Sequence, residues 1–327
     1  MAGTVGELGE FELIAEITAG LLTAANVLVG PGDDCAVFAP DGAVAVSTDT
    51  MVEGRHWRPN WSGPHDVGRK AVASATADLE AEGARPIGLV MSLAMPAGTP
   101  ADWVRQFSAG VREECAKAGI LLLGGDTTGA EQIVVTATVF GDLAGRAPVT
   151  RAGARPGDVV AIRGRLGWAE AGLAVLNRGF RSPAAVVNAH RVPEPPYGQG
   201  IVAAEAGATA MVDVSDGLLA DLGHIAKASG VVIDLDPAAF DIAEPQTAVA
   251  AALGGKDPLS FVLTGGDDHA LAACFAASDV PEGWRVVGKV LPAPAIPELA
   301  EGSVGEPVVL VDGQVWDGAA GWSHFAS

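Results

Sequence analysis

Aspartate-bearing turns recur along this chain, most of them at the ends of apolar segments. The stretch AMVDVSDGLLADLGHI, residues 210–225, shows the pattern: the apolar residues around Asp213 predict a buried strand that ends near Asp216. A carboxylate that leaves water costs several kcal/mol unless a cation or hydrogen bonds replace its hydration. The fold must therefore provide these acids with a cation or with hydrogen-bond donors.

Six turns share this character, and in most of them Asp lies beside Gly, Ser or Thr. Small neighbours allow close approach of a ligand, and hard cations such as Mg²⁺ prefer oxygen donors. A single Asp of this kind is equally expected as a turn former or helix cap. Six such turns in one chain favour a divalent-metal site. The turns contain Asp33 and Asp34, Asp49, Asp78, Asp126, Asp213 and Asp216, and Asp267 and Asp268.

The charge balance excludes several classes of partner. The chain has 40 acidic and 20 basic residues and a net charge of −20, which repels nucleic acid and anionic membranes. The three cysteines, Cys35, Cys115 and Cys274, are scattered and form no zinc pattern. The acidic N-terminus does not resemble a secretory signal, and no apolar run approaches about 20 residues. We therefore expect a soluble, cytoplasmic protein.

The pattern of apolar segments predicts an α/β (α+β) protein of two domains, each a mixed β-sheet with packed helices. The boundary is expected in the turn TRAGARPGD, which gives domains of residues 1–150 and 151–327. Helices are predicted at 9–22, 66–84, 100–119 and 168–179. A further helix is expected after residue 216, with Ser215 or Asp216 as its N-cap. The apolar segment LSFVLTGG, residues 259–266, is interpreted as a strand.

The familiar phosphate-binding loops are absent from the sequence. It contains no GxxxxGK[ST] motif, no GxGxxG motif that opens a helix, and no protein-kinase HRD/DFG set. If the chain uses ATP, the acidic turns must hold the phosphates through metal ions.

The turns occur in an order that resembles the thiamine-monophosphate kinase family of the aminoimidazole-ribonucleotide-synthetase-like ATP-binding superfamily. The resemblance spans nearly the whole chain. It implies two α/β domains, of which the N-terminal one binds ATP and magnesium and forms a homodimer through its sheets. It also implies transfer of the γ-phosphoryl group of ATP to thiamine monophosphate, giving thiamine diphosphate and ADP. The matching stretches are GEFELI, GPGDDCAV, STDTMVEGRHW, ATADLEAEGARP, LGGDTT, TRAGARPGD, DVSDGLLADLGHIAKASG, LTGGDDHAL and GWSHF.

The resemblance also assigns roles to individual residues. Several Mg²⁺ ions are implied, with Asp34, Ser47, Thr48, Asp49, Asp78, Asp126, Asp213 and Asp216 as their ligands. The implied ATP contacts are Gly125, Asp126, Arg151 and Ser215. The implied contacts to thiamine monophosphate are His56, Asp267 and Trp322. No catalytic side chain is expected, because transfer is metal-assisted and in line.

This chemistry agrees with a site rich in carboxylates. The acceptor phosphate monoester is largely a dianion at neutral pH and needs no general base. Two unit charges of the same sign about 4 Å apart repel by about 4 kcal/mol at an effective dielectric constant of about 20. Positioning and charge neutralisation are then the main catalytic requirements.

One departure from the family pattern leaves alternatives open. The family sequence Gly-Gly-Glu-Asp-Tyr-Glu-Leu is GGDDHAL here, so the substrate acid is shorter, and His269 replaces Tyr. Either Asp267 or Asp268 could be the substrate-binding acid. The alternative functions are another ATP-dependent enzyme of the superfamily, such as a synthetase for aminoimidazole ribonucleotide or selenophosphate, and a non-catalytic nucleotide- or Mg²⁺-binding relative.

Overall fold

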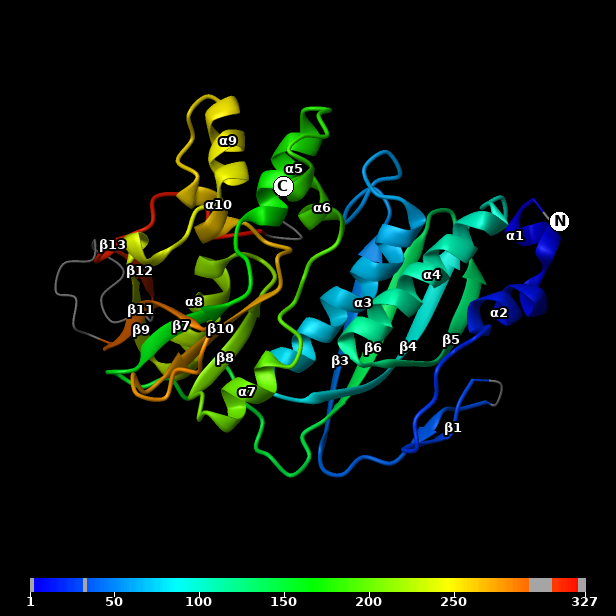
Figure 1. The fold of residues 1–327 in the computed structure, drawn as a ribbon, viewed down its shortest axis with the longest axis horizontal. Helices are drawn as coiled ribbons and strands as arrows, with labels where there is room; N and C mark the ends of the chain where they lie inside the picture. The colour runs from blue at the N-terminus through cyan, green and yellow to red at the C-terminus, as the bar shows by residue number, and fades with distance from the viewer. Residues whose placement is uncertain (1–2, 32–33, 294–307, 323–327) are drawn as a thin grey trace. The chain divides into compact units, whose positions relative to one another are not determined.

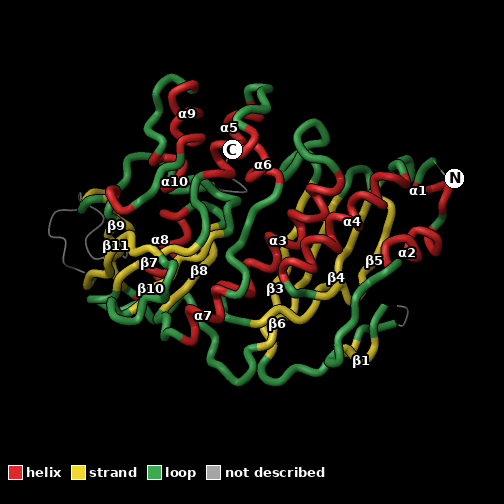
Figure 2. The backbone as a smooth tube through the Cα atoms, viewed as in Figure 1, coloured by secondary structure: helices red, strands yellow, loops and turns green. Residues whose placement is uncertain are grey.

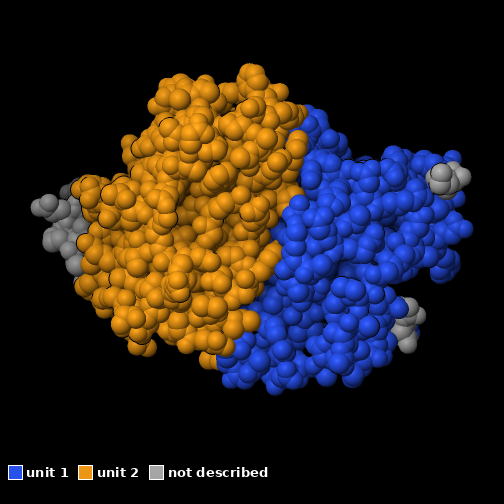
Figure 3. All heavy atoms as spheres, in the orientation of Figure 1, with its two compact units in different colours: residues 1–79, 84–146 blue, residues 80–83, 147–327 orange. Residues whose placement is uncertain are grey.

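The computed structural model describes residues 3–31, 34–293 and 308–322, and the chain divides into two compact units (Figure 3). Unit 1 comprises residues 1–79 and 84–146, and unit 2 comprises residues 80–83 and 147–327. Asp33 and the residues 323–325 of the GWSHF motif lie outside the described residues. None of the described helices is both long enough and apolar enough to cross a membrane.

Unit 1 is built on a four-stranded mixed sheet with the strand order β3-β6-β4-β5 (Figure 1). The β3/β6 and β6/β4 pairs are antiparallel, whereas β4 and β5 are parallel and are joined through helix α4. This mixed topology with packed helices is the predicted fold class. The strands are β3 (Val44–Val52), β4 (Arg85–Met95), β5 (Leu121–Gly129) and β6 (Val134–Asp142), and the long helices are α3 (Pro64–Ala81) and α4 (Ala101–Ala118).

The two faces of this sheet differ in composition. Met51, Ala137 and Val139 are buried on the face covered by α3 and α4. Successive residues of a strand point to opposite faces, so the neighbouring threonines of β3 and β6 point away from these helices. Thr48 and Thr50 are exposed there. The helix-covered core of unit 1 therefore lies on the side of the sheet that faces α3 and α4.

Helices α3 and α4 approach each other closely because two glycines meet backbone atoms. A Cβ on Gly68 would lie 2.2 Å from the carbonyl oxygen of Phe107, and one on Gly110 would lie 2.1 Å from that of His65. Larger side chains at these positions would push α3, which carries Asp78, away from its neighbour.

The helix predicted at 9–22 is present as α2, which is shorter than predicted and follows another short helix, α1. Gly9 separates them with a φ of +82°, a conformation that glycine adopts at little cost. The elements of this region are α1 (Val5–Leu8), α2 (Glu10–Thr18), β1 (Val27–Val29) and β2 (Val37–Phe38), the last two forming a small hairpin.

Unit 2 contains a seven-stranded sheet with the order β13-β12-β9-β11-β7-β10-β8 (Figure 2). Every neighbouring pair is antiparallel except β12/β9. The strands are β7 (Val159–Arg163), β8 (Ala210–Val214), β9 (Val231–Leu235), β10 (Ala270–Phe275), β11 (Arg285–Pro292), β12 (Val309–Val311) and β13 (Gln314–Val315). The helices are α5 (Trp168–Asn177), α6 (Ala184–Arg191), α7 (Gln199–Glu205), α8 (Leu218–Ser229), η1 (Pro237–Ala239), α9 (Glu244–Ala252) and α10 (Leu259–Thr264).

Strand β10 is buried on both faces. Ala272 and Cys274 belong to one hydrophobic cluster, and Leu271 and Phe275 belong to another on the opposite face. Such a central strand has an almost continuous apolar sequence, as the segment from Ala270 to Phe275 does.

The predicted strand at 259–266 is wrong, because Leu259–Thr264 forms helix α10. A short apolar run fits a buried strand or a buried helix equally well by its pattern alone. The Asp257 side chain accepts a hydrogen bond from the Leu259 N–H at 2.9 Å, and the Thr264 hydroxyl donates to the Ser260 carbonyl at 2.8 Å. These local hydrogen bonds support the helical turn.

Candidate active site

The predicted site residues are distributed over both units. Unit 1 contains Asp34, Ser47, Thr48, Asp49, His56, Asp78, Gly125 and Asp126, and unit 2 contains Arg151, Asp213, Ser215, Asp216, Asp267 and Trp322.

Strand β3 and helix α3 bring together part of the predicted metal set. Ser47 and Asp49 are two residues apart and point to the α3 side of the sheet. The Ser47 hydroxyl donates a hydrogen bond to Oδ2 of Asp78 at 2.5 Å. Thr48 points to the opposite face, where its Oγ1 lies 3.0 Å from Oγ1 of Thr138. The Thr48 side chain therefore cannot bind the same ligand as Ser47 and Asp49. Only the backbone carbonyl of Thr48 could do so.

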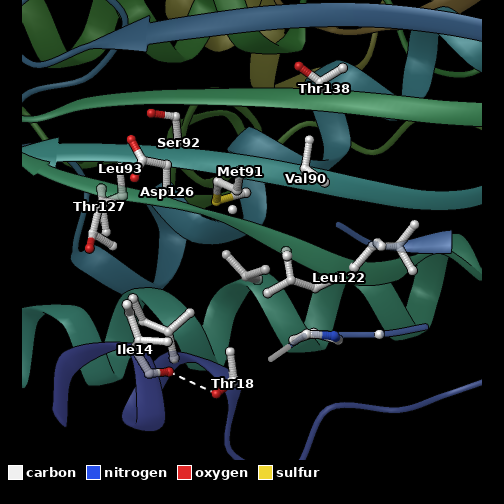
Figure 4. A pocket seen from close by; sticks show the side chains of 18 of the residues that line it. Ile14, Thr18, Val90, Met91, Ser92, Leu93, Leu122, Asp126, Thr127 and Thr138 are labelled. Atoms are coloured by element: carbon white, nitrogen blue, oxygen red, sulfur yellow. Dashed lines mark hydrogen bonds between the residues drawn. The ribbon is translucent and has the colours of Figure 1, made fainter. Parts of the chain in front are cut away.

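Asp34, Gly125 and Asp126 line a cavity of about 990 Å³ in unit 1 (Figure 4). Helix α2, the segment after β1 and strands β4 to β6 contribute to its walls. A Cβ on Gly125 would lie 2.0 Å from the Met91 carbonyl oxygen, so only glycine permits this approach of β5 to β4. The cavity thus combines two carboxylates with a wide, partly apolar space.

The sheet register separates Asp126 from Asp49. Four residues are paired in turn across the sheet and therefore lie on one face: Asp49 of β3, Ala137 of β6, Met91 of β4 and Gly125 of β5. Asp126 is the next residue and therefore points to the opposite face, three strands away. Within unit 1 the predicted metal ligands thus form two groups rather than one.

His56 lies in the tight turn that follows β3. The backbone N–H of Val52 donates to Nδ1 of His56 at 3.0 Å, and the His56 N–H donates to the Val52 carbonyl at 3.1 Å. Because Nδ1 accepts a hydrogen bond, the neutral ring carries its proton on Nε2. His56 can therefore present an N–H donor.

In unit 2, three distant segments meet at the end of β8. The Asp267 N–H donates to the Ser215 carbonyl at 2.8 Å, and the Trp322 N–H donates to the Asp216 carbonyl at 2.8 Å. A Cβ on Gly266 would lie 2.4 Å from the Ser215 carbonyl oxygen. The structure therefore places the predicted residues Asp213, Ser215, Asp216, Asp267 and Trp322 in one locality of unit 2.

The predicted N-cap of α8 is wrong. Gly217, with a φ of +130°, occupies the N-cap position, and Asp221 in the first turn reaches back instead. Its Oδ2 accepts hydrogen bonds from the N–H groups of Asp216 and Gly217, both at 3.0 Å. Burial raises the pKa of Asp221 to about 7, and the nearby Asp213 carboxylate adds to the shift. Asp221 is not among the predicted site residues. It shapes the turn that carries Asp216.

His269 joins two of the predicted acids. Its Nδ1 lies 3.0 Å from Oδ2 of Asp213, and its Nε2 lies 3.8 Å from Oδ1 of Asp267. Burial by itself lowers the pKa of the His269 imidazole, but the two carboxylates outweigh it and raise the pKa to about 10. Sequence reasoning noted His269 as a departure and did not include it among the site residues.

The structure separates the roles of the adjacent acids Asp267 and Asp268. The Asp268 carboxylate accepts hydrogen bonds from the N–H groups of Gly167 at 2.5 Å and Ala169 at 2.9 Å, at the start of α5. Burial raises its pKa to about 7. The Asp267 side chain is 33% exposed, so it is the acid of this pair that a ligand can reach.

Arg151 and Trp322 are anchored mainly through their backbones. The Ser229 hydroxyl donates to the Arg151 carbonyl at 3.0 Å, at the end of α8. Burial raises the pKa of Glu82, and the positive charge of Arg151 partly offsets this increase. Trp322 is 60% exposed. Both side chains are thus available at the surface of unit 2.

The predicted metal ligands form no preassembled metal centre among the described residues. Within the described parts of the chain, no group of three or more His, Cys, Asp and Glu side chains lies in an arrangement that could hold a metal ion. The predicted ligands carry oxygen donors only, and Mg²⁺ takes such donors, often one or two carboxylates together with substrate phosphates and water. The oxygen donors of the predicted ligands therefore have the chemistry that Mg²⁺ prefers.

The chain is similar to a family model over part of its length and to known proteins over most of its length. The family model of the AIR synthase related protein, N-terminal domain, matches residues 32–143. A thiamine-monophosphate kinase of Mycobacterium tuberculosis (strain H37Rv) is 48% identical over 323 residues, which cover 98% of this chain and 93% of the relative. The similarity thus extends through both units.

Two solved structures share the fold over nearly the whole chain. The thiamine-monophosphate kinase of Stenotrophomonas maltophilia K279a aligns with a TM-score of 0.76 at 28% identity, covering 94% of this chain and 96% of that one. A structure described as AaThiL complexed with AMPPCP and TMP also gives a TM-score of 0.76 at 28% identity, covering 99% and 100% of the two chains. The chain belongs to the thiamine-monophosphate kinase family.

Proposed function

We propose that this chain transfers the γ-phosphoryl group of ATP to thiamine monophosphate and forms thiamine diphosphate and ADP. The observation that carries the proposal is the 48% identity to a thiamine-monophosphate kinase over 98% of the chain. The related AaThiL structure holds AMPPCP and TMP, which have the chemistry of these two substrates.

The unit 1 cavity supports a nucleotide site. It is lined by Asp34, Gly125 and Asp126, and its remaining walls include the apolar side chains Ile14 and Leu122 (Figure 4). Ligand pockets in proteins are typically apolar with a few polar groups that fix orientation. We assign the adenosine part of ATP to the apolar walls and the phosphates to the parts of the wall that carry Asp34 and Asp126.

Mg²⁺ is the cofactor that fits the oxygen donors. Within unit 1, Mg²⁺ would be held by the side chains of Asp34, Ser47, Asp49, Asp78 and Asp126 and by the backbone of Thr48. Within unit 2, Mg²⁺ would be held by the side chains of Asp213 and Asp216. When bound, Mg²⁺ neutralises the phosphates and aligns them for in-line transfer. The Ser47 hydroxyl orients the Asp78 carboxylate by its hydrogen bond.

The substrate contacts follow from charge. The thiazolium ring of thiamine monophosphate is cationic, so the accessible carboxylate Asp267 and the exposed ring of Trp322 suit it. The Nε2–H of His56 can donate to a phosphate oxygen. Arg151 and Ser215 supply a cation and a hydroxyl donor for ATP phosphates. No residue has to remove a proton, because the acceptor phosphate is already ionised.

A homodimer fits the exposed face of the unit 1 sheet. On the edge strand β3, Val46 is 59% exposed on this face, and Thr48 and Thr50 are exposed beside it. An uncovered sheet face with exposed apolar side chains is typical of an interface. We propose that a second copy of the chain packs here. The three cysteines are free, which agrees with a reducing, cytoplasmic compartment.

The test follows formation of thiamine diphosphate by the purified full-length chain with ATP, Mg²⁺ and thiamine monophosphate. We expect EDTA to abolish the product, and Asp49→Asn and Asp213→Asn each to reduce turnover about 100-fold, as for other sites where charge stabilisation dominates. Asp279→Asn, an exposed acid of unit 2, is the matched control. Absence of product with the unaltered chain would exclude the proposed reaction, and normal turnover in both variants would exclude the metal assignment.

A further inference from the structure

Four side chains form a continuous series in unit 2. Nδ1 of His190 lies 3.9 Å from Oδ2 of Asp267, Nε2 of His269 lies 3.8 Å from Oδ1 of Asp267, and Nδ1 of His269 lies 3.0 Å from Oδ2 of Asp213. The series runs from α6 through the α10–β10 turn to β8. Both imidazole side chains are only 9% exposed. The contacts therefore lie in a largely water-excluded part of the unit.

The backbone of the α10–β10 turn is arranged to bring this series together. Asp267 and His269 both adopt left-handed conformations, with φ of +69° and +53°. Non-glycine residues rarely take this conformation unless the surrounding structure holds them there. The hydrogen bonds from the Asp267 N–H to the Ser215 carbonyl and from the His269 N–H to the Val214 carbonyl, at 2.8 and 2.9 Å, provide that restraint.

The residue between them anchors the turn from the other side. The Asp268 carboxylate is held by the N–H groups of Gly167 and Ala169. With Asp268 fixed in this way and β8 fixed on the opposite side, the ring of His269 has a defined place between the two outer acids.

The His269 ring lies where two carboxylates would otherwise face each other. Its Nδ1 lies within hydrogen-bonding distance of Oδ2 of Asp213. The other oxygen of that carboxylate, Oδ1, accepts no hydrogen bond from any residue that the structure describes. A histidine N–H on one oxygen of a carboxylate restricts its rotation and directs the other oxygen to a ligand. The same ring limits the approach of Asp267 toward Asp213.

We propose that His269 is a positioning residue that holds Asp213 for Mg²⁺ and Asp267 for thiamine monophosphate, and that His190 acts on Asp267. The inference rests on the proposed function for the identity of the ligands. It separates two effects that a purely structural role would not separate, because His269 contacts both carboxylates, whereas the contact of His190 is with Asp267, on the substrate side.

The test compares His269→Phe, which removes both ring nitrogens at similar size, with His269→Gln, which can retain one donor, and with His190→Phe. For His269→Phe we expect the half-saturating Mg²⁺ concentration to rise at least about 10-fold, as for other residues that orient metal ligands. The KM for thiamine monophosphate should rise as well. His269→Gln should recover part of the Mg²⁺ response, and His190→Phe should raise only the KM for thiamine monophosphate. His224→Phe, at an exposed position of α8, is the control and should change neither quantity.

A second measurement does not depend on turnover. Binding of Mn²⁺ in the presence of a nonhydrolysable ATP analogue, followed by electron paramagnetic resonance, should weaken about 10-fold in His269→Phe and remain unchanged in His190→Phe. An unaltered chain that binds Mn²⁺ but makes no thiamine diphosphate would contradict the proposed function and leave the metal part of the inference testable.

Each outcome decides the inference. A folded His269→Phe variant with the Mn²⁺ affinity and KM of the unaltered chain would overturn it, as would a His190→Phe variant whose Mn²⁺ affinity falls as much as that of His269→Phe. If His269→Phe does not fold, His269→Gln decides: weaker Mn²⁺ binding supports the role, and unchanged binding with unchanged KM overturns it.

Discussion

The hydroxyl of Ser47 in β3 donates a 2.5 Å hydrogen bond to Oδ2 of Asp78 in α3. These residues are 31 positions apart, and the contact exists because α3 packs on the face of the sheet to which Ser47 points. A hydroxyl that donates to one oxygen of a carboxylate restricts the rotation of that carboxylate. The strand therefore contributes to the metal site through orientation as well as through its own acid, Asp49.

Ser47→Ala tests this orientation. We expect the Mg²⁺ concentration for half-maximal turnover to rise about 10-fold, because the Asp78 carboxylate loses the hydrogen bond from the Ser47 hydroxyl. Turnover at saturating Mg²⁺ should change little, whereas Asp78→Asn should lower it about 100-fold. The measurement is a Mg²⁺ titration of thiamine diphosphate formation. Thr247→Ala, an exposed hydroxyl of α9, serves as the control; an unchanged titration in Ser47→Ala would argue against the orienting role.

Gly125→Ala tests the close approach of β5 to β4. The added Cβ would lie 2.0 Å from the Met91 carbonyl oxygen, so the strands must separate. We expect the free energy of unfolding to fall by about 1–3 kcal/mol, as for other overpacked sites, with weaker ATP binding at the distorted cavity. Urea denaturation and calorimetric titration with an ATP analogue measure the two effects.

The same strand offers a matched control for this substitution. A Cβ on Gly129 meets no atom within 4 Å, so Gly129→Ala should leave both quantities nearly unchanged. Equal effects of the two substitutions would show that steric contact at Gly125 is not the cause.

The main helices of unit 1 could be predicted because their periodicity is long and regular. The helices predicted at 66–84 and 100–119 correspond to α3 and α4 within a few residues. The strand predicted at 259–266 failed because the six residues Leu259–Thr264 carry too little periodicity to distinguish strand from helix. Local pattern was sufficient for long elements and insufficient for short buried ones.

The site was predictable in part for a related reason. Turn composition indicated which segments carry carboxylates, and the structure joins Asp213 to the Asp267 turn. The different roles of Asp267 and Asp268 could not be predicted, because the donors to Asp268 lie about 100 positions earlier, at Gly167 and Ala169. The contact between His269 and Asp213 spans 56 positions and depends in the same way on tertiary packing.

Val46→Glu tests the proposed dimer. Val46 is 59% exposed on the uncovered face of the unit 1 sheet, and a charge there would have to be desolvated in an interface. We expect the unaltered chain to sediment as a dimer and the variant as a monomer at the same concentration. Val315→Glu, at a 52% exposed position of β13 in unit 2, should remain dimeric. A dimeric Val46→Glu protein would place the interface elsewhere.

Asp268→Asn tests the buried carboxylate that anchors α5. Burial raises the pKa of Asp268 to about 7, well above the usual aspartate value that the unfolded chain approaches. The folded state therefore retains a proton that the unfolded state releases, and this stabilisation is present at low pH and is lost as the pH rises toward 7. The asparagine side chain does not titrate in this range.

Urea denaturation of both proteins at pH 5, 6, 7 and 8 measures the consequence. We expect the stability of the unaltered chain relative to Asp268→Asn to decrease from pH 5 to pH 7 and then to become constant, because other groups titrate alike in both proteins and cancel in the difference. A difference that stays constant over the whole range would mean that the pKa of Asp268 in the folded state lies below this range, because the N–H groups of Gly167 and Ala169 stabilise the ionised carboxylate at least as much as burial destabilises it.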